Sequence, residues 1–357
     1  MLLPHYRMKG LQQRMNGLRF QGPGLAGYED WRDRLYVPGV EILAREGEEK
    51  GLLPAIRELY AGQVRDWPLL KHRVDALDSI RTRRAQVEGR SLLLQNNPAR
   101  LANAVAPTDP EKIAARPCPL LPENMPPEQM GLPFAGEWVV VCNPLPFSRL
   151  HLVLTSRTHV PQTARGIIRD MLRFTSLTGF ISLYNAPGSG ASIPDHLHLQ
   201  AGPPGRLPLV RQLPKTGNGY TGVISDPALP QRIFLYADSA QRMETLFEGA
   251  AGIINRCSGH AAEAEPRLNL AVISRVEGKV PLVVVHPRTQ HRPSCYYEEG
   301  ERHFMVSPGS VDMAGLVIVP RLEDFRRLDG WKLKNIFRDV CLDRGQFECL
   351  AGELKKI

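Results

Sequence analysis

Short apolar runs alternate along this chain with amphipathic stretches of helical period. Leu52, Ile56, Leu59 and Tyr60 recur at helical spacing, so we predict a helix from Glu41 to about Arg84 with a break near Pro68. Amphipathic patterns predict further helices at 162–177, 240–257 and 331–340.

Strands are predicted where apolar residues form runs of four to seven, bounded by polar or Pro/Gly-rich segments. These runs lie at 91–95, 137–143, 151–155, 180–184, 196–200, 232–236, 268–274, 282–286 and 316–319. Two of them, 137–143 and 151–155, are expected to pair across the turn at 144–146, whereas the Pro-rich stretch 107–133 is expected to be irregular. The order helix–strand–strand occurs twice, which predicts an α+β protein with two similar halves.

Composition and net charge exclude some classes of protein and favour an anionic ligand. The 357 residues are 43% hydrophobic, which excludes a wholly disordered chain, and no apolar run is long enough to cross a membrane. The net charge of +8 favours an anionic partner. The basic residues are scattered, apart from Arg81, Arg83 and Arg84, so a phosphorylated small molecule is favoured over nucleic acid.

The start of the chain lacks the apolar core of a secretory signal, so a cytoplasmic location is expected. The six cysteines contain no C-x-x-C pair and are expected to be reduced thiols.

The segment 185–200, NAPGSGASIPDHLHLQ, contains the candidate catalytic and phosphate-binding residues. In a strand, His196, His198 and Gln200 would share one face, because side chains alternate between faces. The preceding loop contains Gly188, Ser189, Gly190 and Ser192. Glycines allow backbone N–H groups to approach phosphate oxygens, and serine adds a hydroxyl donor.

This row of polar groups allows three interpretations. A neutral imidazole can attack an α-phosphorus and form a nucleotidyl-histidine, while an amide binds a phosphoryl oxygen without moving a proton. The H-x-H pair could instead bind a metal ion, or it could be structural. The residues alone leave these alternatives open.

The chain resembles the histidine-triad superfamily, in the branch of galactose-1-phosphate uridylyltransferase, diadenosine-tetraphosphate phosphorylase and the GDP-hexose phosphorylases. The resemblance rests on 196–200 (HLHLQ), on Asn185 with the loop 188–192, and on 143–154 (NPLP…HLVL). The resemblance covers residues 91–205. Beyond residue 205 only the order of the predicted helices and strands is similar. It implies two histidine-triad-like halves with antiparallel sheets flanked by helices, preceded by a helical extension. The implied domains are 1–90, the catalytic half 91–205 and the degenerate second half 206–357.

The resemblance also implies residue roles. His198 would be the nucleophile, with His196 orienting it and Gln200 binding the phosphoryl oxygen. Asn143 and Asn185 would contact ribose or phosphate, and the loop containing Gly188, Ser189, Gly190 and Ser192 would contact the phosphates. Arg100, in 95–100 (QNNPAR), is a candidate phosphate clamp. Glutamine in place of a third histidine favours transfer or phosphorolysis over hydrolysis.

One departure concerns metal. The uridylyltransferases use a zinc site with C-x-x-C, and here the corresponding stretch 118–121 (CPLL) contains a single cysteine. One thiolate does not make a zinc site, so we predict no metal and no cofactor.

The expected activity is nucleotidyl transfer or phosphorolysis through a covalent nucleotidyl-histidine. The expected donor is a nucleoside diphosphate sugar or a dinucleoside polyphosphate, and the acceptor is inorganic phosphate or a sugar phosphate. The alternatives are a metal-dependent hydrolase and a non-catalytic nucleotide- or RNA-binding protein. The sequence leaves open a homodimer, the role of residues 1–40, the role of His286, His291 and His303, and the turn at 307–310.

Overall fold

The structure is a computed structural model that describes residues 27–216, 219–275 and 279–357. It is an α+β protein built on one nine-stranded antiparallel sheet, in the order β3-β4-β5-β7-β6-β10-β11-β9-β8. Its strands are β3 (Gly131–Phe134), β4 (Trp138–Cys142), β5 (Leu152–Ser156), β6 (Ile181–Asn185), β7 (His198–Gly202), β8 (Gly222–Asp226), β9 (Arg232–Tyr236), β10 (Leu268–Ile273) and β11 (Leu282–Pro287). Pairing of β6 with β10 joins the strands of the first half to those of the second.

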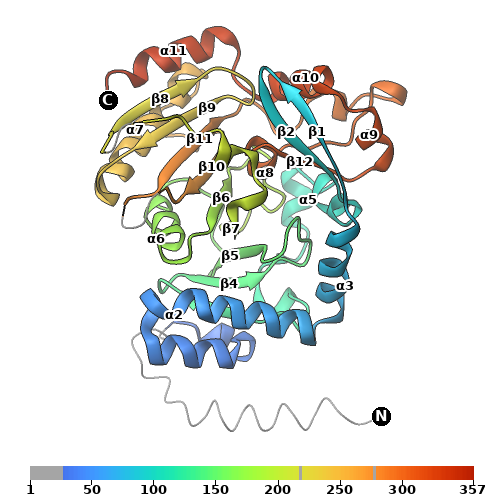
Figure 1. Cartoon of the computed structure of the whole chain (residues 1–357), viewed down its shortest axis with the longest axis vertical. Helices are drawn as coiled ribbons and strands as arrows, with labels where there is room; N and C mark the ends of the chain where they lie inside the picture. The colour runs from blue at the N-terminus through green and yellow to red at the C-terminus, as the bar shows by residue number, and fades with distance from the viewer. Residues whose placement is uncertain (1–26, 217–218, 276–278) are drawn as a thin grey trace.

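A second, three-stranded sheet lies beside the first. It contains the hairpin β1 (Arg81–Val87) and β2 (Arg90–Asn96), with β12 (Leu316–Val319) parallel to β2. Helices α9 (Leu322–Arg327) and α10 (Gly330–Val340) lie next to it at the upper right of Figure 1. A separate apolar cluster, which includes Leu92, Leu94, Ile336 and Phe337, joins this sheet to the two helices.

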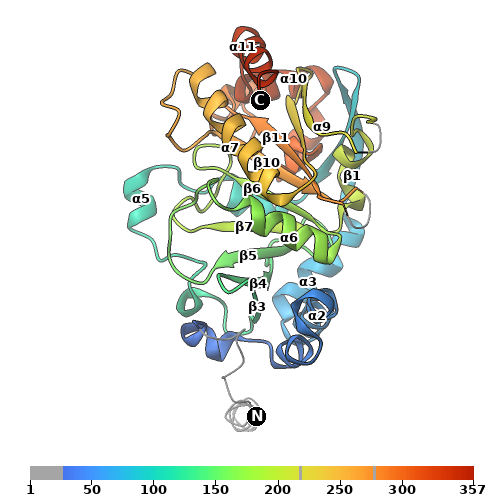
Figure 2. The ribbon, with the colours of Figure 1, turned by 90° about the vertical axis from the view of Figure 1, so that its left-hand side faces the viewer.

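The main sheet is buried on both faces. One face packs against α2 (Val37–Asp66), α6 (Ile168–Thr178), α7 (Ala240–Cys257) and α11 (Arg344–Leu354), and Figure 2 shows α2, α6 and α7 along this side. The opposite face packs against residues 207–209, α8 (Ser310–Met313) and β12. Strand alternation assigns Leu199 to the first face, so His198 and Gln200 point to the second.

Most predicted elements are present, with shifted ends. The apolar stripe of the first long helix is confirmed, because Leu52, Ile56 and Leu59 are fully buried. The predicted break is also found: α2 ends at Asp66, and α3 (Pro68–Ala76) begins with Pro68 at its first position. The predicted extension of this helix to Arg84 is wrong, because residues 81–87 form β1.

The helix predicted from residue 162 begins only at Ile168. The Gln162 side chain bonds the backbone of β6 and β7, donating to Asn185 O at 3.0 Å and accepting from His198 N at 2.8 Å. The strand predicted from His196 likewise begins only at His198. Helix α7, β12 and the pairing of β4 with β5 match the prediction.

The remaining helices are short: α4 (Leu101–Ala104) and α5 (Pro110–Ala114) lie in the largely irregular stretch before β3. In the described part of the chain, no helix combines the length and apolarity needed to cross a bilayer. The prediction of six reduced cysteines is wrong for two of them, because Cys257 and Cys349 form a disulfide. Packing of α11 on α7 brings them together across 92 residues of sequence.

Candidate active site

His198 opens β7 with a fixed backbone and a defined tautomer. The Gln162 amide accepts from His198 N and donates to His198 O, which fixes the main chain on both sides. His198 Nδ1 lies 2.9 Å from His196 O. A carbonyl can only accept, so Nδ1 carries the proton and Nε2 keeps its lone pair. Nε2 makes no hydrogen bond with any described residue. Burial lowers the pKa of His198 to about 4, so the ring is neutral at pH 7.

Gln200 is oriented by a histidine from the neighbouring strand segment. His151 is fully buried, and its Nδ1 accepts from Phe147 N at 3.4 Å, which assigns the ring proton to Nε2. Asn143 Nδ2 also lies 3.3 Å from Nε2, and with this tautomer that longer contact is not a hydrogen bond. That Nε2 lies 2.9 Å from Gln200 Oε1. Because Oε1 accepts this proton, the Gln200 NH2 group is left free to donate, and Gln200 lines the cavity described below. Gln200 can therefore donate a hydrogen bond from its NH2 group to a ligand in that cavity.

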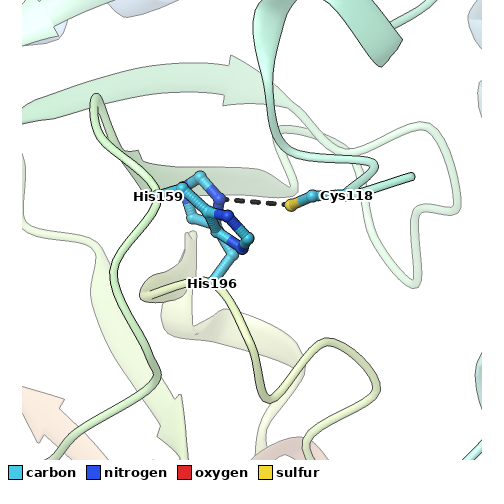
Figure 3. A group of neighbouring side chains, drawn as sticks. All are labelled: Cys118, His159 and His196. Carbon is cyan, nitrogen blue, oxygen red and sulfur yellow. Dashed lines mark hydrogen bonds between the residues drawn. The ribbon is translucent and has the colours of Figure 1, made fainter. Parts of the chain in front are cut away.

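His196 lies just before β7 and is fully buried. Its Nε2 lies 2.9 Å from Ser156 O and 3.0 Å from Thr155 Oγ1, so Nε2 donates and Nδ1 has a lone pair. Nδ1 lies 3.2 Å from Cys118 Sγ. The His159 ring stacks on His196 with centroids 5.2 Å apart, and Figure 3 shows both imidazoles beside the thiol.

Cys118, His159 and His196 form a candidate metal site. Their ligand atoms all lie within 4.8 Å of one another. Thiolate and imidazole are the ligands that zinc prefers in tetrahedral sites. The neighbouring Asp195 is not part of this group: its carboxylate is paired with Arg116 and lies 3.8 Å from His159 Nε2. The prediction of no metal assumed that Cys118 had no partners, and the structure corrects that premise: two imidazoles lie next to it.

A small cavity of about 50 Å³ lies on the same sheet face as Gln200. It is lined by residues from α4 and the turn before it, from the glycine-rich loop, and from the segment 307–320. Three buried polar atoms of its lining residues have no hydrogen-bond partner: Arg100 Nε, Asn103 Oδ1 and Ser310 Oγ. A volume of this size accommodates roughly three or four waters, which is about the size of a phosphoryl group.

The cavity is lined by one cation, Arg100, and one carboxylate, Asp312. Burial lowers the pKa of Arg100 to about 10, which leaves it a cation at neutral pH. Burial raises the pKa of Asp312 to about 6. The Asp312 carboxylate accepts from Gly309 N at 2.9 Å and Ile318 N at 2.8 Å, so it fixes its own loop. The donors that remain are Arg100, Ser310 and the Gln200 amide.

Asn185 joins the two halves of the sheet at this cavity. Its Oδ1 accepts from Ser310 N at 2.6 Å and from Asn269 Nδ2 at 2.8 Å. Asn269 Oδ1 in turn accepts from Arg288, which also donates to Pro308 O at 2.8 Å. Arg288 is fully buried and bonds mainly carbonyls, so it ties the second half to the loop before α8.

Five predicted site residues line this cavity: Arg100, Asn185, Gly190, Ser192 and Gln200. His198 does not line it but precedes Gln200 by two residues on the same face of β7. The loop is held close to the segment 307–310, because a Cβ at Gly190 would lie 2.5 Å from Pro308 O.

Besides His196 and His198, three more predicted residues lie outside the cavity lining. Asn143 Oδ1 accepts from Leu145 N at 2.8 Å and shapes the turn after β4. Gly188 adopts φ +69°, and a Cβ there would make only an ordinary contact, 3.8 Å from the Arg267 side chain. Ser189 is fully buried, and its carbonyl accepts from Asn269 and Arg288.

Sequence reasoning missed four residues at the site: His151, Gln162, Ser310 and Arg288. His151 and Gln162 lie in segments that were interpreted only as a strand and a helix. A polar residue at the start of an apolar strand was the available signal for His151. Ser310 reaches the cavity from the second half of the chain, and Arg288 bonds the carbonyls of Ser189 and Pro308 beside it. Their local sequence contains no signal.

Comparison with known proteins gives the following. Residues 59–203, less than half of the chain, match a family model described as "Domain of unknown function (DUF4922)". No curated protein matches the chain. Among solved structures, yeast Ap4A phosphorylase Apa2 in complex with AMP has a TM-score of 0.47 at 15% identity, covering 78% of this chain and 96% of that chain.

The same yeast protein in complex with Ap4A has a TM-score of 0.49 at 15% identity, covering 77% of this chain and 96% of that one. Without ligand it has a TM-score of 0.46 at 15% identity, with 77% and 94% covered. At these values neither family nor activity is assigned from the solved structures. At the sequence level, the chain is similar over residues 59–203 to the family described as DUF4922.

Proposed function

We propose that this protein is a nucleotidyltransferase or phosphorylase that works through a covalent nucleotidyl-His198. The observation that supports this most strongly is the hydrogen bond from His198 Nδ1 to His196 O, which leaves Nε2 with a free lone pair. The donor is a nucleoside diphosphate sugar or a dinucleoside polyphosphate, as the sequence resemblance implies. The acceptor is inorganic phosphate or a sugar phosphate.

In the first step, the His198 Nε2 lone pair attacks the α-phosphorus, an N–P bond forms, and the P–O bond to the leaving phosphate breaks. The leaving oxygen departs as a phosphate, so a general acid is not required. The imidazole ring becomes more positive as the N–P bond forms. The Nδ1–H group stays hydrogen-bonded to the His196 carbonyl, and this bond stabilises the positive charge.

In the second step, an oxygen of the acceptor phosphate attacks the same phosphorus and the N–P bond breaks, which restores neutral His198. The Gln200 NH2 group, oriented by His151, donates to a non-bridging oxygen in both steps. Arg100 and Ser310 bind the adjacent phosphate in the cavity. Cys118, His159 and His196 would hold a structural metal ion that fixes the His196 ring, and no step passes through it.

The rival metal-dependent hydrolase needs His196 and His198 as joint ligands. His196 Nδ1 faces Cys118, whereas His198 Nδ1 faces a carbonyl. The free lone pair of His198 is on Nε2, and the group of possible metal ligands found among the described residues contains His196, Cys118 and His159 but not His198. A site that uses His196 and His198 jointly is therefore not favoured, which supports transfer over metal hydrolysis.

A turnover assay tests the proposal. The protein is incubated with a panel of nucleotide sugars and dinucleoside polyphosphates, with and without inorganic phosphate or a sugar phosphate. We expect one donor to be consumed only when the acceptor is present, and His198→Ala to lose this turnover by at least about a thousandfold. The control His260→Ala changes an exposed histidine and should retain it.

Two results would contradict the proposal. Acceptor-independent hydrolysis that a chelator abolishes would favour the metal-dependent hydrolase. Nucleotide binding without turnover of any donor, with a steep salt dependence, would favour a non-catalytic binding protein.

A further inference from the structure

A second cavity, of about 600 Å³, lies between the β1–β2 hairpin and the segment 205–212 that follows β7. The hairpin stands at the upper right in Figure 1. Residues of β1 alternate between two sides: Val87 belongs to the apolar cluster under α9 and α10, whereas Thr82 and Arg84 point to the other side and line the cavity. The opposite wall contains Arg206 and Arg211.

The charge of this cavity is entirely of one sign. Four arginines line it (Arg84, Arg90, Arg206 and Arg211), and no aspartate or glutamate does so within the described residues. Arg90 is paired with Asp226. The other three are exposed and make no ion pair or hydrogen bond with any described residue.

The walls that present these arginines are fixed to each other. Gln212 Nε2 donates to Ser91 O at 2.8 Å, and Gln212 Oε1 accepts from Arg232 at 2.9 Å. On the other side of the segment, Leu209 N donates to Ala314 O at 3.0 Å. The three free guanidinium groups are therefore carried on backbone that is already ordered, which lowers the entropic cost of binding an anion between them.

We propose that this cavity is a binding site for a phosphorylated small molecule, separate from the cavity beside His198. The two cavities share no lining residue. A guanidinium group can bind two oxygens of one phosphate through two parallel N–H···O hydrogen bonds. The Thr82 and Ser91 hydroxyls add neutral hydrogen-bonding groups. The inference does not depend on the reaction proposed for His198.

The size and composition of the cavity favour a small molecule over nucleic acid. Small-ligand pockets typically measure about 300–1,000 Å³ and combine apolar walls with a few polar groups. Here Leu93 and Pro208 supply apolar surface beside the arginines. A nucleic-acid site would instead spread its cations along a stripe, whereas these arginines line one cavity.

The test is calorimetric titration of inorganic tripolyphosphate into the full chain and into two variants of equal net charge. The pocket variant is Arg84→Gln/Arg206→Gln/Arg211→Gln. The control variant is Arg57→Gln/Lys112→Gln/Arg326→Gln, which removes three cations outside both cavities. We expect wild type and control to bind with equal affinity and the pocket variant to bind at least about a hundredfold more weakly.

Four results would overturn the proposal. They are an absence of binding to wild type, equal affinity of the pocket variant and wild type, an equal loss in the control variant, and binding of a single-stranded oligonucleotide in place of tripolyphosphate. Arg100→Gln, which removes the cation of the cavity beside His198, should leave this binding event unchanged. A failure here is therefore distinguishable from a failure of the proposed reaction, which the turnover assay reports separately.

Discussion

His151 Nε2 lies 2.9 Å from Gln200 Oε1, and this contact decides which end of the Gln200 amide faces the cavity. Without it, the amide could rotate and present its oxygen to a phosphate, which would repel it. The ring is itself fixed by Phe147, whose backbone N–H faces Nδ1. His151 therefore acts on the reaction through Gln200 and is a positioning residue.

We predict that His151→Phe lowers kcat about ten- to hundredfold, because it removes the hydrogen bond that orients Gln200. It keeps the ring volume but also leaves Phe147 N–H without its acceptor, so the midpoint of thermal unfolding should fall modestly. A double-mutant cycle checks the cause. Gln200→Ala should cost much less in the His151→Phe background than in wild type. Equal costs in both backgrounds would show that His151 does not act through Gln200.

Gly190 is the position in the loop where a side chain has no space. It has φ +87°, and a Cβ there would lie 2.5 Å from Pro308 O and 2.9 Å from Gly309 Cα. We predict that Gly190→Ala lowers the free energy of unfolding by about 2–4 kcal/mol and reduces turnover, because the loop must move away from α8.

Gly188→Ala is the matched control. Gly188 also has positive φ, at +69°, but its nearest neighbour lies 3.8 Å away. Only the backbone cost of about 1 kcal/mol should appear in urea unfolding. Equal losses in the two variants would mean that the contact between the loop and residues 308–309 is unimportant.

The cluster of Cys118, His159 and His196 predicts a bound metal ion, contrary to our expectation from the sequence. Metal analysis of the purified protein should find about one zinc per chain. Cys118→Ala should lose it and lower the midpoint of thermal unfolding, whereas Cys295→Ala, which changes a free cysteine elsewhere, should retain it. Metal-free wild-type protein with unchanged stability after chelation would uphold the sequence prediction instead.

His286, which is buried, and His291, which is partly buried, predict that the fold is weaker in mild acid. Burial lowers the pKa of His286 to about 3 and that of His291 to about 4, from an ordinary 6.5. The unfolded chain therefore binds more protons than the folded one below pH 6.5, and stability is lost as the pH falls from 6.5 towards 4. At pH 5, each histidine should cost about 2 kcal/mol relative to pH 7.5.

Asp312 acts in the opposite direction, because its pKa is raised to about 6 and protonation stabilises the fold. Urea unfolding at pH 7.5 and pH 5, in wild type and in His286→Gln, separates the contributions. The difference between the two pH values should shrink by about 2 kcal/mol in the variant. An unchanged difference would mean that His286 is not the titrating group.

Much of the fold could be predicted from local pattern. Helix α7 has the predicted bounds, because its apolar residues follow a helical period between clear end signals. The strands around the H-x-H-x-Q motif are apolar runs bounded by turns. Strand β1 was missed because its sequence, RTRRAQV, is largely polar and its sheet is completed by β12, more than 200 residues away.

The site could be predicted only where it is continuous in sequence. The motif 196–200 and the loop before it identified Gln200, Gly190 and Ser192, which the structure places at one cavity. Partners that come from elsewhere carry no local signal. His159 lies 41 residues after Cys118, and Ser310 reaches Asn185 from the second half of the chain. Such contacts are determined by tertiary packing.

Intact-protein mass spectrometry tests the central claim most directly. The protein is mixed with each candidate donor in the absence of phosphate, so that the second step cannot occur. We predict a mass gain equal to one nucleotidyl group, which disappears on adding the acceptor and is never formed by His198→Ala. An adduct of the same mass on His198→Ala, or turnover of a donor without any adduct on wild type, would contradict a nucleotidyl-His198 intermediate.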